Sequence, residues 1–283
     1  MPQRPVPGRQ PANVYRVRRA IAATIAVVVL FLLWQLVSSF TGGGDETTAT
    51  TAAPTTTTTL APPPDCAEGD VVVAQDPDVA WSTILVDTER SLPPGYGPGD
   101  LHNISDAGFP FTDGLAVRQL VLEDLDAMRQ AAVDNGTPLS ILAAYRSYEQ
   151  QAGLFERRVD EMGASEAGSR VARPGHSEHQ LGTTIDVTDE GATDVDQSWG
   201  ASPAGQWVAS NAHKFGFLLS YPSNAQPRTC YDYEPWHLRY VGREQAADVI
   251  ASGLTLREYL WDLEQLALAA ATPAPTTTTQ PQG

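Results

Sequence analysis

The sequence predicts an α+β domain, in which a small mixed or antiparallel sheet is flanked by helices. One observation gives this class, and two more give the bounds of the domain and the segment ahead of it. Between residues 65 and 271, segments with helical periodicity alternate with short apolar or β-branched segments. Regions rich in Pro, Thr and Ala lie outside these bounds, which leaves one folded domain of about 200 residues. A basic and then an apolar stretch opens the chain and predicts one transmembrane helix ahead of the domain.

The N-terminal region is predicted to anchor the chain in a membrane. Residues 1–19 contain five arginines and no acid, and residues 20–40 are uncharged and mostly apolar. About 20 helical residues span about 30 Å, the thickness of a bilayer's hydrocarbon core, and the arginines place the N-terminus in the cytoplasm. A cleaved signal peptide is the alternative. Because the apolar run is long and SSFTGGG has no clear A-x-A site, we expect an uncleaved single-pass anchor with the domain outside the cell.

Two low-complexity segments flank the domain. Residues 41–64 are mostly Thr, Ala and Pro, which predicts an extended linker, and residues 272–283 repeat this composition as a disordered tail. The part after the anchor holds all 34 acidic residues against 13 basic ones, an excess of 21 negative charges. This charge argues against nucleic acid or anionic lipid as a partner. The sequence gives no indication of the oligomeric state.

The first half of the domain shows a helix, a strand and a second helix. Apolar residues recur at helical spacing over residues 114–134, between Asp113 as a possible N-cap and Gly136 as a stop. Residues 139–145 form a short buried strand. Ser147 followed by Gln150 is a capping box that begins the next helix, so residue 146 is expected at the turn between strand and helix.

The second half continues with the same kinds of element. Ser202 and Pro203 begin a helix that ends at Gly216, and residues 217–221 form a strand. Thr255 and Glu258 cap the last helix.

The two cysteines, Cys66 and Cys230, are expected to form a disulfide. Outside the cell a bridge is favoured, and closing so long a loop contributes on the order of 5 kcal/mol in the chain-entropy model. Two free thiols are the alternative. Metal binding by either cysteine is disfavoured because neither has a CxxC partner.

Two distant segments carry the residues of a catalytic zinc site. RPGHSEHQLGTTIDV contains His179 and Asp186, and YEPWHL contains Glu234 and His237. Two imidazoles and a carboxylate can hold Zn²⁺ and leave one position open for water, while a second carboxylate can accept the proton of that water. We therefore predict His179, Asp186 and His237 as zinc ligands and Glu234 as general base. The alternatives are a polar structural cluster, or Glu234 as a fourth ligand of a closed site.

The local sequence predicts how these residues are held. Gly182 lets the chain turn between the first two ligands, and the β-branched residues 183–187 favour a strand that carries Asp186. Pro235 disfavours a helix interior, so Glu234 and His237 are expected near a strand end.

SEHQLGTTID resembles the SxHxxGxAxD motif, and EPWH the ExxH motif, of the VanY-type D-alanyl-D-alanine carboxypeptidases, a family of zinc peptidases. Thr184 replaces the usual Ala with another small residue. AYRS, from residue 144, and LPPGYGPGDL, from residue 92, are also similar to the family. The resemblance covers roughly residues 87–260.

The resemblance implies a substrate and further site residues. Arg146 would hold a substrate carboxylate or the developing oxyanion, and Gln151, Ser177 and Tyr231 match positions that bind the peptide end. A surface ion pair is the alternative for Arg146, and a hydrogen-bonded loop role is the alternative for the other three.

The implied enzyme is a membrane-anchored D,D-carboxypeptidase that removes the C-terminal D-amino acid from peptidoglycan stem peptides. An L,D-carboxypeptidase and a cross-link endopeptidase are alternatives with the same site. A zinc-bearing cell-wall-binding domain is a third, although such a domain has no need of a base at Glu234.

Overall fold

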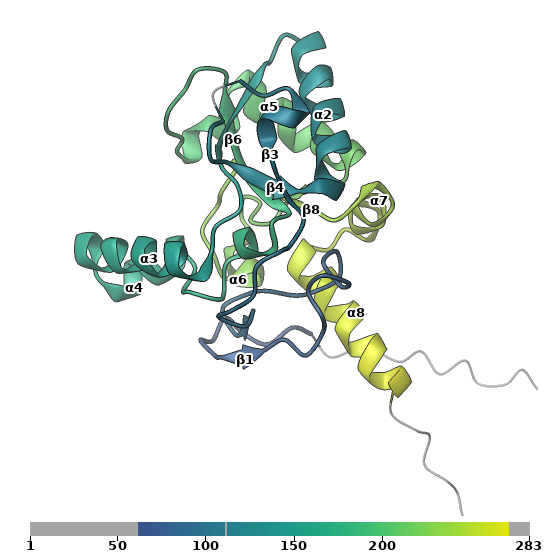
Figure 1. Cartoon of the computed structure of the whole chain (residues 1–283). Helices are drawn as coiled ribbons and strands as arrows, with labels where there is room; N and C mark the ends of the chain where they lie inside the picture. Colours follow the sequence, from purple (N-terminus) through teal and green to yellow (C-terminus); the bar gives the residue numbers. More distant parts are fainter. Residues whose placement is uncertain (1–61, 111, 272–283) are drawn as a thin grey trace, which may run out of the picture. The chain divides into compact units, whose positions relative to one another are not determined.

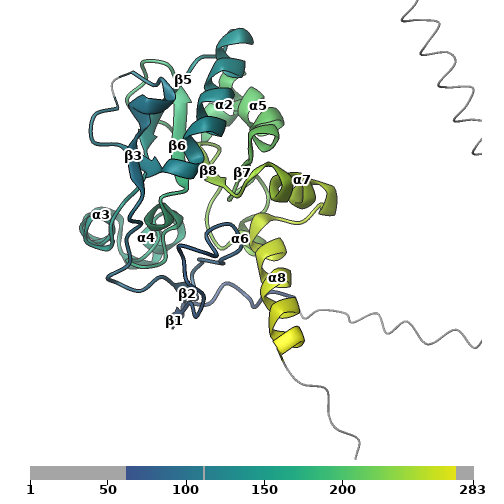
Figure 2. The same ribbon diagram turned by 45° about the vertical axis from the view of Figure 1, so that its right-hand side comes forward.

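The computed structural model describes residues 62–110 and 112–271, which form the α+β fold predicted from the sequence. Short strands alternate with helices along the chain (Figures 1 and 2). The strands are β1 (Val71–Val72), β2 (Arg90–Ser91), β3 (Leu101–Asn103), β4 (Ala116–Arg118), β5 (Leu139–Ala143), β6 (Thr184–Asp189), β7 (Phe217–Leu219) and β8 (His237–Tyr240). The helices are α2 (Leu122–Asp134), α3 (Tyr148–Met162), α4 (Ala164–Arg170), α5 (Pro203–Asn211), α6 (Gln226–Thr229), α7 (Arg243–Ser252) and α8 (Leu256–Ala271). Short 3₁₀ helices are η1 (Ile104–Ala107), η2 (Gln119–Val121), η3 (Glu178–Leu181), η4 (Gln197–Ala201) and η5 (Ala212–Phe215).

The largest sheet has four antiparallel strands in the order β5-β6-β8-β7. The register places Asp186 of β6 directly opposite His237 of β8. Residues paired in this way point to the same face of a sheet. The other four strands form two separate two-stranded sheets. In one, β1 and β2 are parallel, and in the other, β3 and β4 are antiparallel. The sheet content is therefore mixed, but the sheet that carries the site is antiparallel.

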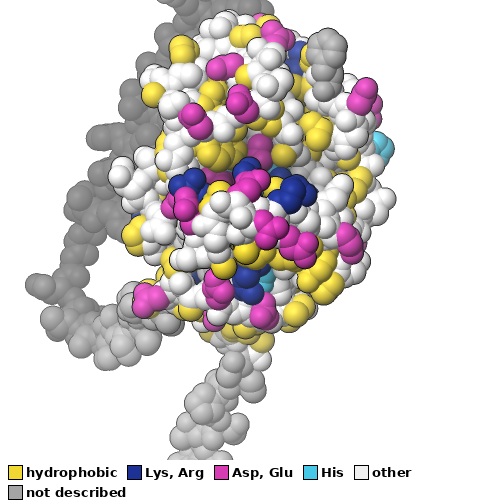
Figure 3. Space-filling model, turned by 90° about the vertical axis from the view of Figure 1, so that its left-hand side faces the viewer, with side chains coloured by type: hydrophobic (Ala, Val, Ile, Leu, Met, Phe, Trp, Pro, Cys, Tyr) yellow, Lys and Arg dark blue, Asp and Glu magenta, His cyan; other side chains and the backbone are white. Residues whose placement is uncertain are grey.

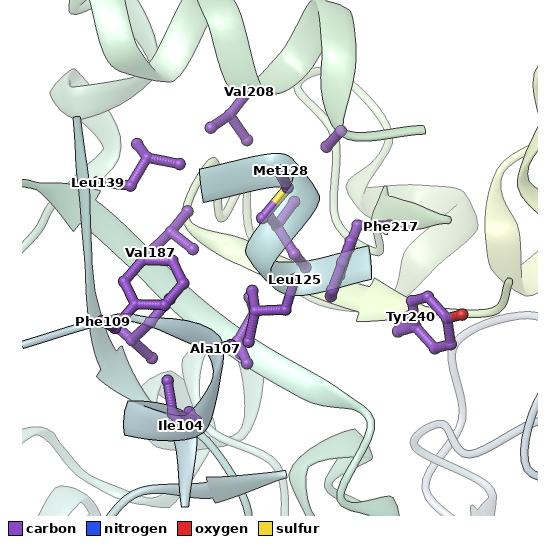
Figure 4. Close-up of a cluster of buried hydrophobic side chains, with 14 of the residues drawn as sticks. Ile104, Ala107, Phe109, Leu125, Met128, Leu139, Val187, Val208, Phe217 and Tyr240 are labelled. Carbon is purple, nitrogen blue, oxygen red and sulfur yellow. The ribbon is translucent and has the colours of Figure 1, made fainter. Parts of the chain in front are cut away.

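Helices α2 and α5 cover one face of this sheet. The main hydrophobic core lies between these helices and the sheet. Leu125 and Met128 of α2 lie close to Val187 and Phe217 of the sheet, with Val208 of α5 nearby (Figure 4). All five side chains are fully buried. Close packing of this kind keeps the strands in one register.

The helix predicted over residues 114–134 is shorter than the sequence suggested. Its first part is the strand β4 and the 3₁₀ turn η2, and α2 begins at Leu122 without a side-chain cap. Ala116–Arg118 pairs with β3, so a non-local ladder replaces the first helical turns. Val117 and Val121 are nevertheless both buried, which explains the helical spacing in the sequence. The predicted stop is confirmed, because Gly136 has a φ of 78° just after the helix.

Three predicted helix starts are confirmed by their hydrogen bonds. Ser147 and Gln150 form a reciprocal capping box at α3. The hydroxyl of Ser202 accepts a bond from Gly205 N ahead of Pro203 in α5. At α8, Glu258 N donates to the Thr255 hydroxyl at 3.3 Å, and Thr255 N donates to the Glu258 carboxylate at 2.8 Å. Each satisfies N–H groups that have no partner within the helix.

The predicted disulfide is present between Cys66 and Cys230, whose positions are 164 residues apart. It fastens the first described residues to the segment that follows α6. Arg173 adds hydrogen bonds to the carbonyl oxygens of Gly69 and Thr88. The stretch before β1 is thus tied to the loop that leads into the second predicted zinc segment.

No helix within residues 62–110 and 112–271 is long and apolar enough to cross a membrane. The anchor predicted at residues 20–40, most of the linker predicted at 41–64 and the tail predicted at 272–283 lie outside the described residues.

Candidate active site

The three predicted metal ligands meet at one point beside the two central strands of the four-stranded sheet. Asp186 and His237 face each other on β6 and β8, and His179 comes from η3 immediately before β6. Asp186 Oδ1 lies 3.4 Å from His179 Nε2 and 3.4 Å from His237 Nδ1. The three ligand atoms are all within 4.8 Å of one another. Two strands and one turn thus bring together residues that are 58 positions apart at the extremes.

Gly182 makes the predicted turn between His179 and Asp186. Its φ of 70° is in the left-handed region, which glycine adopts without steric cost. A Cβ atom at this position would lie 3.0 to 3.1 Å from Arg118, Leu101 and Pro98. Both the backbone conformation and the close neighbours therefore favour glycine where η3 passes into β6.

The hydrogen bonds of the two histidines leave one ring nitrogen of each directed at Asp186. His179 Nδ1 donates to the Ala144 carbonyl oxygen at 2.7 Å, so its Nε2 carries the lone pair. His237 Nε2 lies 2.9 Å from Glu178 Oε2, which leaves Nδ1 for the site. Asp186 Oδ1 is buried and has no hydrogen-bond partner. Two imidazole nitrogens and one carboxylate oxygen without a hydrogen-bond partner form a donor set that fits Zn²⁺.

Electrostatics keep Asp186 in the form that a ligand requires. Burial alone would raise its pKa, but the neighbouring His179 and His237 outweigh burial and lower the pKa below its ordinary value. The carboxylate is therefore ionised before a metal arrives.

Glu178 is a functional residue that the sequence analysis missed. Its carboxylate accepts hydrogen bonds from Arg239 at 2.9 Å and from the Ser220 hydroxyl, and it contacts His237. Burial would raise the pKa of Glu178, yet Arg239 and His237 lower it to about 2. A carboxylate behind a metal-binding imidazole fixes the ring and makes it a stronger ligand. An acidic residue beside His179 in the sequence was the one signal that could have suggested this role.

Glu234 lies in the turn just before β8, as predicted. Its Oε2 atom is 3.4 Å from His237 Nδ1, and its side chain is only 14% exposed. Burial raises the pKa of Glu234 to about 8, against the opposing effect of His237. The group within 4.8 Å consists of the other three residues, so Glu234 stands beside the metal ligands and is suited to exchange a proton.

Arg146 lies at the turn between β5 and α3, where the sequence placed it. Its guanidinium donates to Gln151 Oε1 at 2.7 Å, and Gln151 Nε2 in turn donates to the Ala172 carbonyl oxygen at 2.6 Å. No carboxylate lies within 4 Å of it in the described part of the chain. Burial lowers the pKa of Arg146, while Asp186 and Glu234 oppose this shift. A half-buried cation held by an amide, without an acidic partner, is suited to an anionic ligand.

All eight residues predicted for catalysis, metal and substrate line one cavity of about 290 Å³. Ser177 and Tyr231 are both buried in its wall. The Tyr231 ring packs 5.0 Å from Tyr221, whose ring lies 4.7 Å from that of His237. The set consists of Arg146, Gln151, Ser177, His179, Asp186, Tyr231, Glu234 and His237.

Comparison with known proteins identifies relatives of this chain. The family model of VanY, D-alanyl-D-alanine carboxypeptidase, matches residues 114–243. A D-alanyl-D-alanine carboxypeptidase of Enterococcus faecalis (strain ATCC 700802 / V583) is 31% identical over 195 residues, which cover 66% of this chain and 68% of the relative.

Two solved structures share the fold and about a third of the aligned residues. The L,D-carboxypeptidase LdcB is 35% identical with a TM-score of 0.61, over 68% of this chain and 89% of the other. A zinc complex of a variant of the D,D-pentapeptidase VanY from a VanB-type resistance cassette is 30% identical with a TM-score of 0.54, over 64% of this chain and 99% of the other.

Proposed function

The chain belongs to the VanY family of D-alanyl-D-alanine carboxypeptidases and is a zinc metallopeptidase, and on this premise we propose that it is a membrane-anchored D,D-carboxypeptidase. It removes the C-terminal D-amino acid from peptidoglycan stem peptides outside the cell. The observation that carries the proposal is the unpartnered oxygen of Asp186, 3.4 Å from a nitrogen of each histidine. The name of the Enterococcus faecalis relative supports the substrate class.

His179, Asp186 and His237 hold the metal. A zinc ion at such ligands lowers the pKa of a bound water toward about 7 and polarises a carbonyl group. Glu234 accepts the proton of the attacking water at its carboxylate and returns it to the leaving amine. A cation at the three ligands favours the ionised form of Glu234, which a base requires.

Arg146 selects the chain end. A guanidinium can bind both oxygens of a terminal carboxylate through two parallel hydrogen bonds. Gln151 fixes the orientation of Arg146 through its bond at 2.7 Å. Binding the terminal carboxylate here places the last peptide bond, and no internal one, beside Glu234 and the metal ligands. This role disfavours a cross-link endopeptidase, which has no free chain end to bind.

An L,D-carboxypeptidase is the second candidate, favoured by the similarity to LdcB. It would remove the terminal D-amino acid from a tetrapeptide, where the scissile bond follows an L-configured centre. The same metal ligands and the same Arg146 would serve both reactions.

Mass spectrometry of stem peptides tests the proposal. The purified protein is incubated with a stem pentapeptide, a tetrapeptide and a cross-linked dimer, with and without a chelator. We expect the pentapeptide to lose one D-alanine, and the chelator to abolish this loss. Cleavage of the tetrapeptide alone would favour the second candidate, and cleavage of the dimer alone would favour the endopeptidase.

The membrane anchor belongs to the proposal because residues 20–40 are apolar and follow five arginines. Fractionation of cells that express the full chain should recover it with the membranes. A variant without residues 1–40 should be recovered in the soluble fraction. Equal distribution of both forms would reject the anchor.

A further inference from the structure

A second cavity adjoins the catalytic cavity and shares part of its lining. The catalytic cavity, of about 290 Å³, is at the lower limit for ligand pockets and has room for little more than a chain end. The second cavity measures about 640 Å³. Five residues line both: Arg158, Arg170, Val171, Glu234 and Trp236. The part of a substrate that precedes the scissile bond can therefore extend into the second cavity.

The lining residues give the order of positions along this path. Arg146 and Gln151 line the catalytic cavity alone, whereas Glu234 lines both cavities. Arg158 and Arg170 also line both cavities, so a peptide whose carboxylate lies at Arg146 meets these two arginines where the catalytic cavity adjoins the second one. The terminal residue is thus nearest Arg146, and the earlier residues approach α3 and α4.

The length of α3 along the cavity wall indicates how many substrate residues fit between Gln151 and Arg158. Gln151, Leu154 and Arg158 follow one another at three and four positions on the wall of the catalytic cavity. At 1.5 Å per residue, Gln151 and Arg158 are separated by about 10 Å along the helix. An extended peptide covers this distance with about three residues. On this spacing we expect the third residue from the C-terminus beside Arg158, and Arg170 of α4 lines the same two cavities.

Among the described residues, the ion pairs of these two arginines are largely exposed to solvent. Arg158 lies 2.7 Å from Glu161, and its side chain is 45% exposed. Arg170 lies 3.0 Å from Glu166 and 3.8 Å from Asp232, with a side chain 54% exposed. Pairs of this kind contribute little to stability and exchange partners readily. Both guanidinium groups can therefore bind an incoming carboxylate.

The same cavity also carries acidic groups. Asp196 and Asp232 line it together with the two arginines. One oxygen of Asp196 accepts bonds from the backbone N–H and the hydroxyl of Ser198, which fix the orientation of the side chain. Figure 3 shows Lys/Arg and Asp/Glu side chains next to one another across the face that includes α3 and α4. The second cavity is thus lined by both positively and negatively charged side chains, and it adjoins the cavity that holds Glu234 and the metal ligands.

We propose that the second cavity binds a zwitterionic side chain, one that ends in both an ammonium and a carboxylate, on the third residue from the substrate's C-terminus. Arg158 and Arg170 bind the carboxylate, and Asp196 and Asp232 bind the ammonium. The inference rests on the proposed function, because in a stem pentapeptide this third residue is the diamino acid. The enzyme therefore prefers diaminopimelate, whose side chain carries both groups, over lysine, which carries only the ammonium.

Four synthetic pentapeptides with the same D-Ala-D-Ala end test this preference. They differ only at the third residue, which is diaminopimelate, its side-chain carboxamide, its side-chain N-acetyl derivative, or lysine. We expect kcat/KM for free diaminopimelate to exceed that for each of the others by about five- to fiftyfold, a range typical of partly exposed charged hydrogen bonds.

Substitutions test the two arginines and the two aspartates of the cavity separately. Arg158→Gln and Arg170→Gln should lower kcat/KM for diaminopimelate while leaving the value for lysine within about twofold. Asp196→Asn and Asp232→Asn should lower it for diaminopimelate and for lysine, but not for the N-acetyl derivative. Zinc content of each variant reports whether the site is still folded.

Two matched controls come from this chain. Arg157→Gln removes the neighbouring arginine of α3, which lines neither cavity. Arg243→Gln removes an arginine of α7 with a similarly exposed side chain, 52%, and an aspartate partner. Neither control should change the ratio of kcat/KM between the diaminopimelate and lysine peptides.

The outcomes distinguish this inference from the function on which it rests. Equal cleavage of all four peptides would overturn the zwitterion site and leave the carboxypeptidase intact. Dependence on the carboxylate without dependence on the ammonium would overturn the role of Asp196 and Asp232. Failure to cleave any of the peptides would overturn the proposed function, and this inference with it.

Discussion

The Nε2 atom of His237 lies 2.9 Å from Oε2 of Glu178, on the opposite side of the ring from the Nδ1 atom that faces Asp186. Glu178 therefore fixes the tautomer and the orientation of one metal ligand. The other oxygen of Glu178 accepts a bond from Arg239, whose side chain is fully buried. One carboxylate thus connects the metal centre to a cation inside the fold.

Glu178→Gln should weaken metal binding and lower stability together. Replacing a carboxylate behind a metal-binding histidine lowers metal affinity by about 10- to 100-fold. Leaving Arg239 buried without its partner costs about 3 to 5 kcal/mol of unfolding free energy. Zinc competition titrations and urea unfolding measure the two effects.

The double variant Glu178→Gln/Arg239→Met serves as its control. It should regain part of the stability, because the unpaired cation is gone, but none of the metal affinity. Full recovery of both would show that Glu178 acts on the metal only through the fold.

The contrast between Glu178 and the metal ligands shows what the sequence can predict. His179, Asp186 and His237 belong to two spaced motifs, and all three meet in the structure. Glu178 depends on partners 42 to 61 positions away, on Ser220, His237 and Arg239. No local pattern specifies such contacts, because they arise only when β8 pairs with both β6 and β7.

The same reasoning explains the secondary structure. Capping residues specify α3 and α5 locally, so their starts are predicted correctly. Residues 116–118 have suitable spacing for a helix, but they pair with β3 instead. Pairing with a distant strand outweighs a weak local preference.

Replacing both Cys66 and Cys230 by Ser should lower the unfolding free energy by up to about 5 kcal/mol, because the bridge closes a loop of 164 positions. Urea unfolding of the variant and of the oxidised and reduced wild type measures this loss. Thiol counting under denaturant should find no free thiol before reduction. An unchanged unfolding midpoint after reduction would mean that the bridge does not stabilise this domain.

Glu234→Gln should keep the metal and lose turnover. The amide has nearly the same shape but cannot accept the proton, so kcat should fall by about 10²- to 10⁴-fold. Zinc content and single-turnover kinetics on the pentapeptide measure the two properties. Near wild-type turnover in this variant would place the base elsewhere.

Amidation of the substrate's C-terminus should lower kcat/KM by about tenfold to a thousandfold, because it removes the carboxylate that Arg146 binds. Arg146→Lys should be nearly as harmful, since an ammonium cannot form the two parallel bonds. In Arg146→Ala, amidation should have little further effect. Equal cleavage of free and amidated peptides by the wild type would contradict this role and favour an endopeptidase.

The zinc content of the wild-type protein and of His179→Ala tests the central assignment most directly, because three ligands leave no spare donor. Both proteins are purified without chelator, and zinc per chain is measured by inductively coupled plasma mass spectrometry. We expect about one zinc per chain in the wild type and almost none in His179→Ala, with the loss of pentapeptide cleavage. Full zinc occupancy in His179→Ala would contradict the metal site described here.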